Sequence, residues 1–290
     1  MYLIKNAAAF FLLLLLTPAI LGDPLRAETK TPIDVMWART DFAPYFIVKG
    51  EHQGKGISDQ IIVHLTKKIS IVKHHPVNMS LKRMLKNARS GVAICHVALL
   101  RTPERETFID YSLPIMKSYP NGIITTAKGL EKFGLTPKTI APLNLEKLID
   151  KNLSISVHDG RSYSPYIDNI IKQELSKKHS IFRVKTGLKE HERLVLMMAN
   201  NRLDGLIARP EEVQFINIDQ KLDQTLYFVK IIDNSSTDFS HVGCSKGDWN
   251  KELIKQINTL IEEDEVLIKT INDAQNKWLP THLHSSHIFH

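Results

Sequence analysis

Hydrophobic residues recur along this chain with two alternating periods. Ile57, Ile61, Ile62, Leu65 and Ile69 follow helical spacing, which predicts a helix with one buried face. Shorter apolar runs lie between such stripes and predict strands. The predicted strands cover 33–37, 75–79, 92–100, 122–126, 153–157, 181–184, 206–208, 226–232 and 241–244. The predicted helices cover 57–69, 81–88 with Ser80 as cap, 145–149, 163–175, 194–199, 253–261 and 267–278, with Pro280 ending the last. This alternation predicts an α/β fold with layered sheets.

The segment from Arg101 to Pro114, RTPERETFIDYSLP, carries the most informative chemistry. It follows the apolar strand at 92–100 and is predicted to form a loop around Arg105, a short strand and a Ser-x-Pro turn. A guanidinium can hold a carboxylate through two parallel hydrogen bonds, which a lysine cannot reproduce. Arg105 is therefore a candidate anion-binding residue. The alternative is a surface arginine in a basic loop.

The N-terminus has the pattern of a secretion signal. Lys5 precedes an apolar run over 7–19, and Pro18 and Gly22 interrupt its end. The run is shorter than the roughly 20 residues that a membrane-spanning helix needs, so cleavage is favoured over anchoring. We predict a signal peptide over 1–27, cleaved after Ala27. No cysteine lies near it to carry a lipid, so the pattern predicts an unlipidated periplasmic protein.

Composition refines this picture only slightly. The formal net charge is +7, but the lysines are scattered over helix faces and form no basic stripe interleaved with aromatic residues. We therefore expect no nucleic-acid or membrane partner, whereas a mildly basic protein suits an anionic ligand. The histidines form no metal motif. Those of the tail over 282–290, predicted to be flexible, could hold a metal loosely.

Four stretches, taken in order, resemble the family 3 solute-binding proteins, the periplasmic receptors for amino acids and similar solutes. They are Asp41–Phe46 followed by Gly54–Asp59, the Arg105 loop with Tyr111-Ser112-x-Pro114, Val157–Tyr163, and Lys246–Trp249 with the helices ending at Lys277-Trp278-Leu279. The resemblance covers nearly all of the chain after the signal. It implies a type II periplasmic-binding-protein-like fold with two lobes and a two-strand hinge. Lobe 1 would comprise 28–125 and 236–281, with lobe 2 inserted over 126–235.

The same resemblance implies a ligand site. Arg105 would be the main anchor for a ligand carboxylate, with Phe42, Thr102 and Ser162 beside it. Phe42 would cover the apolar part of the ligand or fill the core of the lobe. Ser162 would donate its hydroxyl to the ligand or cap a helix. The turn at Gly160 lies between a strand and a helix, where free N–H groups and the helix dipole favour an anion.

Departures from the family pattern point to the kind of ligand. In the amino-acid receptors an acidic residue binds the ligand ammonium, and the matching position here is Arg209, followed by Pro210. A guanidinium there repels an ammonium group. We therefore expect a small anionic solute with an apolar part, held by Arg105, Arg161, Arg209 and Phe42. The alternative for Arg209 is an outward-pointing side chain.

Two functions remain open at this point. The first is a solute-binding protein, expected to be a monomer without cofactor, that closes its lobes on a solute and serves a transporter or a sensor. The second is an enzyme on the same scaffold, similar to cyclohexadienyl dehydratase, which needs an acid in the cleft with a raised pKa. Glu104, Glu106 and Asp159 are the candidates, although ion pairing with Arg101 or Arg105 is the simpler role.

Two cysteines, Cys95 and Cys244, are the only ones in the chain. In the family's arrangement the returning strand joins the sheet of the first lobe, which would bring them together. A disulfide and a pair of buried free thiols on different strand faces both stay open.

Overall fold

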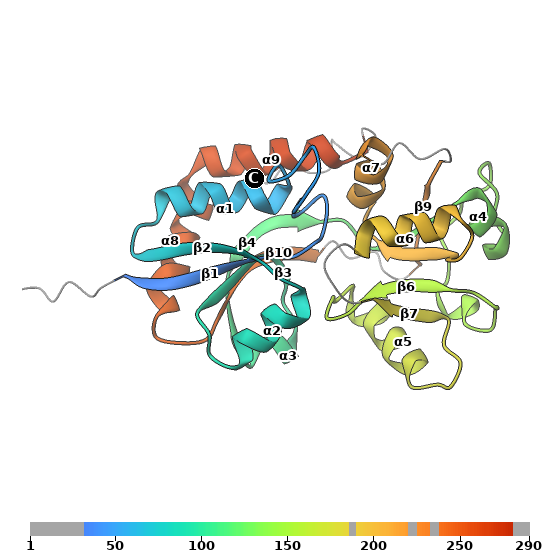
Figure 1. Ribbon diagram of the computed structural model, residues 1–290, viewed down its shortest axis with the longest axis horizontal. Helices are drawn as coiled ribbons and strands as arrows, with labels where there is room; N and C mark the ends of the chain where they lie inside the picture. Colours follow the sequence, from blue (N-terminus) through green and yellow to red (C-terminus); the bar gives the residue numbers. More distant parts are fainter. Residues whose placement is uncertain (1–31, 186–189, 220–224, 233–237, 281–290) are drawn as a thin grey trace, which may run out of the picture. The chain divides into compact units, whose positions relative to one another are not determined.

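The computed structural model describes residues 32–185, 190–219, 225–232 and 238–280 (Figure 1). The predicted signal peptide, its cleavage site after Ala27 and the tail over 282–290 lie outside the described residues. Within the described part, no helix is long and apolar enough to cross a membrane.

The first sheet has five strands in the order β2-β1-β3-β10-β4. Their bounds are β1 (Ile33–Arg39), β2 (Val72–Asn78), β3 (Ile94–Leu100), β4 (Ile109–Ser118) and β10 (Asp238–Ser245). β1 pairs in parallel with β2 and β3, whereas β10 runs antiparallel to β3 and β4. The sheet is therefore built from both ends of the described chain.

The second sheet also has five strands, in the order β7-β6-β8-β5-β9. Their bounds are β5 (Gly122–Thr125), β6 (Ile155–His158), β7 (Phe182–Lys185), β8 (Gly205–Ala208) and β9 (Tyr227–Lys230). β6 is parallel to β7 and β8, and β5 is antiparallel to β8 and β9. The strand–helix alternation expected from the sequence thus forms two mixed sheets, each with helices packed on it.

Helices cover the sheets and bury their apolar stripes. Those of the first lobe are α1 (Ile57–Lys68), α2 (Leu81–Arg89), α3 (Pro103–Glu106), α8 (Asn250–Glu263) and α9 (Glu265–Trp278). Those of the second lobe are α4 (Ala127–Phe133), the 3-10 helix η1 (Glu146–Leu148), α5 (Pro165–Leu175), α6 (Glu190–Ala199) and α7 (Pro210–Asp219). Leu65 and Leu253 belong to one core of the first lobe, and Met84 to another. α3, α4 and α7 are absent from the sequence prediction, which expected a loop around Arg105 where α3 lies.

Local signals explain several boundaries. Ser80 caps α2 as predicted, because its Oγ accepts a hydrogen bond from the amide of Arg83 at 3.3 Å. α5 begins at Pro165, later than the predicted start at residue 163. Its cap is Ser164, whose Oγ accepts from the Ile167 amide at 3.2 Å. Ser162 is therefore not the helix cap.

The predicted Ser-x-Pro turn is wrong. β4 continues without a break through Pro114 to Ser118. Proline lacks the N–H that an inner strand must donate, so it is tolerated on edge strands. β4 pairs only with β10 in the strand order, and the pairing register shifts beside Pro114. Pro114 therefore lies within an edge strand and not in a turn.

The chain changes sheets between β4 and β5, and again between β9 and β10. The sequence analysis expects the first part of lobe 1 to end at residue 125, which is the last residue of β5. The structure pairs β5 inside the second sheet, so the change falls over 119–121 instead. The predicted boundary at residue 235 lies outside the described residues.

Cys95 and Cys244 are joined by a disulfide. They lie directly opposite each other on the antiparallel strands β3 and β10, with their Cα atoms 4.0 Å apart. The bridge connects positions 149 residues apart and ties the returning strand to the N-terminal part of the sheet.

Candidate functional site

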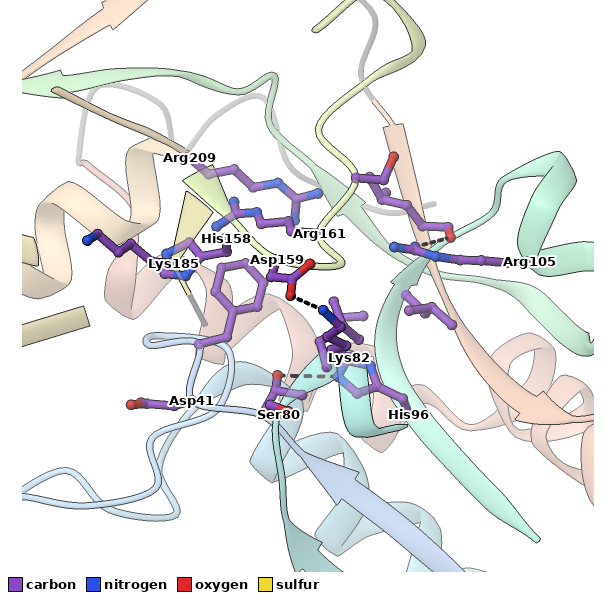
Figure 2. Close-up of a pocket in the computed structure, with 17 residues that line it drawn as sticks. Asp41, Ser80, Lys82, His96, Arg105, His158, Asp159, Arg161, Lys185 and Arg209 are labelled. Atoms are coloured by element: carbon purple, nitrogen blue, oxygen red, sulfur yellow. Dashed lines mark hydrogen bonds and ion pairs between the residues drawn. The ribbon is translucent and has the colours of Figure 1, made fainter. Parts of the chain in front are cut away.

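A cavity of about 110 Å³ lies where several strand ends and loops meet (Figure 2). β3, the start of α2 and the segment after β1 form one wall. The loop after β6, the end of β7 and the residue after β8 form the other. Its lining residues are Thr40, Asp41, Phe42, Ser80, Leu81, Lys82, His96, Ala98, Leu99, Leu100, Arg105, His158, Asp159, Arg161, Ser162, Lys185 and Arg209. Five of the six residues predicted for the ligand site are among them, and Thr102 is not.

Arg105 lies in the short helix α3 and is only 6% exposed. Its Nη1 donates to the carbonyl oxygen of Leu100 and its Nη2 to that of Gly160, both at 2.8 Å. Burial lowers the pKa of Arg105. Among the described residues no carboxylate forms an ion pair with it. Arg105 is therefore a buried cation held by neutral carbonyl groups, which an incoming carboxylate can replace as acceptors.

Thr102 has a local structural role. Its Oγ1 accepts a hydrogen bond from the Arg105 amide at 3.3 Å and caps α3, with Pro103 at the first helical position. Thr102 therefore helps to position Arg105 from outside the cavity. In this bond the oxygen of the Thr102 hydroxyl is the acceptor, so its proton is not used by it.

The hydroxyl of Ser162 is also engaged. Its Oγ donates to Asp168 Oδ2 at 2.5 Å, and the Tyr163 amide donates to Asp168 Oδ1 at 2.9 Å. Asp168 thus anchors the turn that carries Ser162 to the first turn of α5. Ser162 lines the cavity, but its proton points to Asp168.

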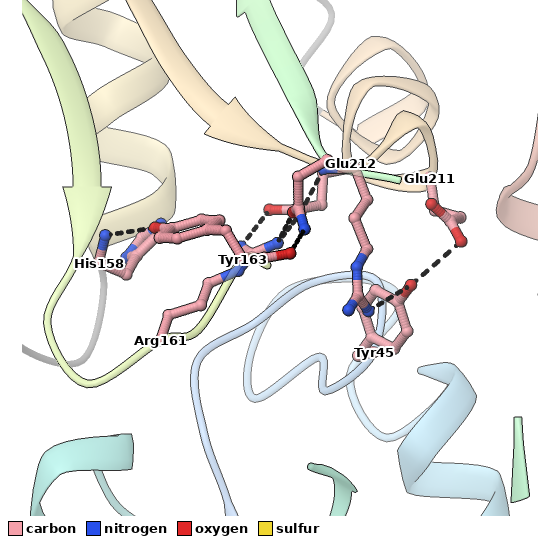
Figure 3. Close-up of polar contacts among 8 residues, drawn as sticks. Tyr45, His158, Arg161, Tyr163, Glu211 and Glu212 are labelled. Atoms are coloured by element: carbon pink, nitrogen blue, oxygen red, sulfur yellow. Dashed lines mark hydrogen bonds and ion pairs between the residues drawn. The ribbon is translucent and has the colours of Figure 1, made fainter. Parts of the chain in front are cut away.

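Arg161 has a carboxylate partner that the sequence analysis missed. Its Nη2 donates to Glu212 Oε1 at 2.7 Å, and its Nη1 donates to Glu212 Oε2 at 3.2 Å (Figure 3). The side chain of Arg161 is 8% exposed and that of Glu212 is fully buried. Burial is the largest single effect and lowers the pKa of Arg161. The charge and hydrogen bonds of Glu212, together with Tyr163 and Tyr45, outweigh it, so the net pKa shift is upward.

Arg209 is buried as well, with 3% exposure, so it does not point outward. Its Nη1 donates to the hydroxyl of Tyr45 at 3.2 Å, and that hydroxyl donates to Glu211 Oε1 at 3.0 Å. Burial raises the pKa of Glu211 to about 7 and also raises that of Tyr45. Glu211 and Glu212 occupy the first turn of α7, where acidic residues suit the helix dipole.

Phe42 is half-buried and lines the cavity. Its ring stacks on Tyr45 at 4.6 Å between centroids, and the guanidinium carbon of Arg161 lies 4.3 Å from its centroid. A ring fixed in this way presents an apolar surface beside the guanidinium of Arg161. Tyr45 is fully buried and belongs to the core of the first lobe.

The cavity also contains polar residues that the sequence did not single out. Lys82 donates to Asp159 at 2.8 Å, and Lys185 lies at the end of β7. His96 is 2% exposed, and its Nε2 lies 3.4 Å from Thr40 Oγ1. Burial, followed by the charge of Arg105, lowers the pKa of His96 to about 3, so this imidazole stays neutral at pH 7.

Charge is therefore unevenly distributed around the cavity. Five lysine or arginine side chains line it, against two aspartates. Glu212 and Glu211 compensate part of this charge from behind the wall, since neither lines the cavity. The excess of positive charge favours an anion.

The three acids suggested for enzymatic chemistry have ordinary surroundings. Glu104 pairs with Arg89, Glu106 with Arg101 and Asp159 with Lys82. Glu211 has the raised pKa that an acid catalyst needs. It is hydrogen-bonded to Tyr45, however, and it does not line the cavity. In the part of the chain that the structure describes, no cluster of His, Cys, Asp or Glu side chains could hold a metal ion.

Comparison with known proteins gives similarity in structure but not in sequence. No family model and no curated protein matched the sequence. The substrate-binding protein of an amino acid ABC transporter is similar, with 18% identity, a TM-score of 0.60 and coverage of 85% of this chain and 98% of that one. The periplasmic binding protein of an arginine transport system from Legionella pneumophila has 15% identity, a TM-score of 0.60, and 85% and 100% coverage.

A histidine kinase sensor domain with similarity to periplasmic binding proteins is also similar, with 15% identity, a TM-score of 0.63, and coverage of 86% of this chain and 96% of that domain. The periplasmic VFT2 domain of Bordetella pertussis BvgS has 16% identity, a TM-score of 0.60, and coverage of 84% of this chain and 93% of that domain. These likenesses confirm the fold expected from the sequence motifs. The described part of this chain therefore has the two-lobe α/β fold found in substrate-binding proteins of amino-acid ABC transporters and in periplasmic sensor domains.

Proposed function

We propose that this chain is a periplasmic solute-binding protein that captures a small anionic organic solute between its two lobes. The observation that carries the proposal is the buried guanidinium of Arg105, which lines a cationic cavity and, among the described residues, donates to two carbonyl oxygens and pairs with no carboxylate. A carboxylate is the natural exchange partner for such a group. Arg161 and Arg209 add positive charge, and Phe42 supplies the apolar surface.

The partners follow from this proposal. A receptor that exchanges solute by opening and closing its lobes delivers it to a membrane transporter or reports it to a sensor protein. The similar structures include a substrate-binding protein of an ABC transporter and a histidine kinase sensor domain. The segment over 119–121 would be one strand of the hinge, because the chain passes from the first sheet to the second there.

A thermal-shift panel tests the ligand class, since a ligand that binds the folded state raises the melting temperature. The anionic arm contains 3-phenylpropionate, benzoate, succinate and inorganic phosphate. The zwitterionic arm contains phenylalanine, glutamine and alanine. We expect the largest shift in the anionic arm. Larger shifts with the α-amino acids would contradict the anionic assignment and leave a solute-binding role in place.

A second experiment examines the native ligand directly. Mass spectrometry of small molecules released from denatured, freshly purified protein should detect a bound acid. Conversion of the released compound by the intact protein would instead favour the enzymatic alternative.

A further inference from the structure

The hydroxyl of Tyr45 lies between two buried charged groups (Figure 3). It accepts from Arg209 Nη1 at 3.2 Å and donates to Glu211 Oε1 at 3.0 Å. Tyr45 belongs to the segment between β1 and α1, whereas Arg209 and Glu211 stand at the start of α7. Arg209 and Glu211 therefore interact through a hydroxyl group supplied by a distant part of the chain.

Both charged groups retain an unused polar atom. Glu211 Oε2 and Arg209 Nε are buried without a hydrogen-bond partner. Glu211 is 0% exposed and Arg209 is 3% exposed. A buried carboxylate in which one oxygen accepts no hydrogen bond is costly to keep ionised. Protonation of Oε2 removes that cost.

Among the neighbouring groups, Arg209 contributes most to keeping Glu211 ionised. Arg209, the backbone amide of Glu211 and Tyr45 favour the ionised form of Glu211, whereas burial and Glu212 favour the protonated form. Glu212 is itself occupied by Arg161 and by the amide of Arg209. The other elements packed against α7 are α9 and β9, whose charged residues are Glu265, Lys269, Asp273, Lys277 and Lys230. None of these five is among the main contributors to the pKa shift of Glu211.

The two charged groups differ in their access to the cavity. Arg209 lines it and Glu211 does not. An anion in the cavity therefore meets a guanidinium whose positive charge already stabilises Glu211. When the anion pairs with Arg209, it offsets the positive charge of the guanidinium. An ionised Glu211 then loses its main stabilising interaction.

We propose that Glu211 takes up one proton from solvent on Oε2 when an anionic solute binds against Arg209, so that capture of the solute is coupled to pH. This inference rests on the proposed function, because it requires an anionic solute. The coupling is reciprocal: the factor by which the anion raises the proton affinity of Glu211 is the factor by which protonation tightens anion binding. Binding is thus strongest where Glu211 is already neutral.

The experiment measures the Kd of 3-phenylpropionate, or of the panel acid with the largest thermal shift, from pH 5.5 to 8.5 by calorimetry. In the wild-type protein we expect a nearly constant Kd below pH 6 and a rise of up to about tenfold per pH unit above pH 7. Glu211→Gln mimics the protonated side chain. We expect this variant to show a flat profile and tighter binding than wild type at pH 8.

Two further measurements secure the interpretation. Glu131→Gln removes an exposed carboxylate on α4 and should keep the wild-type profile. Calorimetry of wild-type protein at pH 7.5 in HEPES and in Tris, buffers with different ionisation enthalpies, should show net proton uptake on binding. This second measurement needs no variant to fold.

The outcomes separate the two proposals. A pH dependence that persists in Glu211→Gln would place the proton on another group, such as His158 in the cavity wall, and would overturn the inference. Zero proton uptake with measurable binding would also overturn it while the proposed function stands. Failure of every acid in the panel to bind would overturn both.

Discussion

The two walls of the cavity differ in whether a buried guanidinium has a carboxylate partner. On one wall Arg105 contacts two carbonyl oxygens and has no carboxylate partner among the described residues. On the other wall Arg161 is paired with Glu212, and Arg209 reaches Glu211 through Tyr45. The positive charge of Arg105 is therefore available to a ligand, whereas that of Arg161 is largely used to stabilise the fold.

The walls also differ in how they are held. The disulfide between Cys95 and Cys244 fixes β3, which leads into the Arg105 segment. The opposite wall depends on buried charges and hydrogen bonds. A covalent crosslink keeps its strength when pH changes, but a carboxylate pair does not. We expect the second wall to be the one that responds to substitution of acids and to pH.

Glu212→Ala should give the largest effect. It leaves Arg161 buried without its carboxylate and removes the acceptor of the Arg209 amide. Breaking a buried pair in this way costs about 3–5 kcal/mol of unfolding free energy. Urea unfolding measures it, with Glu131→Ala on the surface of α4 as a control that should stay within about 0.5 kcal/mol of wild type. A loss below about 1 kcal/mol for Glu212→Ala would mean that the pair does not hold this wall.

Loss of the disulfide comes next. The bridge spans 149 positions, so reduction should lower the unfolding free energy by about 2–5 kcal/mol. Urea unfolding with and without dithiothreitol measures the change. Alkylation under denaturing, non-reducing conditions should find no free thiol in protein exported to the periplasm. Two reactive thiols would show that the first wall is not crosslinked.

Arg105→Ala tests the claim that this guanidinium is the one available to a ligand. Loss of a charge-assisted hydrogen-bond pair should weaken binding of 3-phenylpropionate by about 1.5–3 kcal/mol. Arg101→Ala is the matched control, because Arg101 is 60% exposed, pairs with Glu106 and does not line the cavity. Calorimetry that shows the same affinity for Arg105→Ala and wild type would contradict the assignment.

The pH dependence of stability should give the smallest effect. The pKa of Glu211 is about 7 in the folded protein and about 4.5 in an ordinary environment, so the folded state binds its proton more tightly. Its contribution to unfolding free energy is therefore present below about pH 4.5 and is lost as the pH rises through about 7. Between pH 5 and 8, wild type should lose on the order of 1–3 kcal/mol relative to Glu211→Gln. Parallel stability curves for the two proteins would place the raised pKa elsewhere.

Strong local patterns made most of the elements predictable. The stripe in α1, the Ser80 cap of α2 and the apolar run of β3 are signals contained within a few residues. The missed helix α7 also carries such a signal. Pro210 stands at its first position and two acids follow in the first turn, a combination typical of helix starts.

The partners of the site residues were harder to predict. The hydroxyls of Thr102 and Ser162 have polar groups within reach in the native fold, namely the Arg105 amide and Asp168. A sequence shows that a hydroxyl is present but not which neighbour it will meet. The predicted roles of these two residues toward a ligand therefore depended on contacts that only packing reveals.

The sequence by itself determined the alternation of strands and helices, the two-lobe fold through its motifs, and the presence of arginines at several candidate positions. Only the tertiary structure decided which of those arginines are compensated. Glu212 lies 51 positions from Arg161, and Glu211 lies 166 positions from Tyr45. Periodicity reports the neighbours of a residue within one element, whereas the charge balance of a buried group depends on whatever the folded chain brings against it.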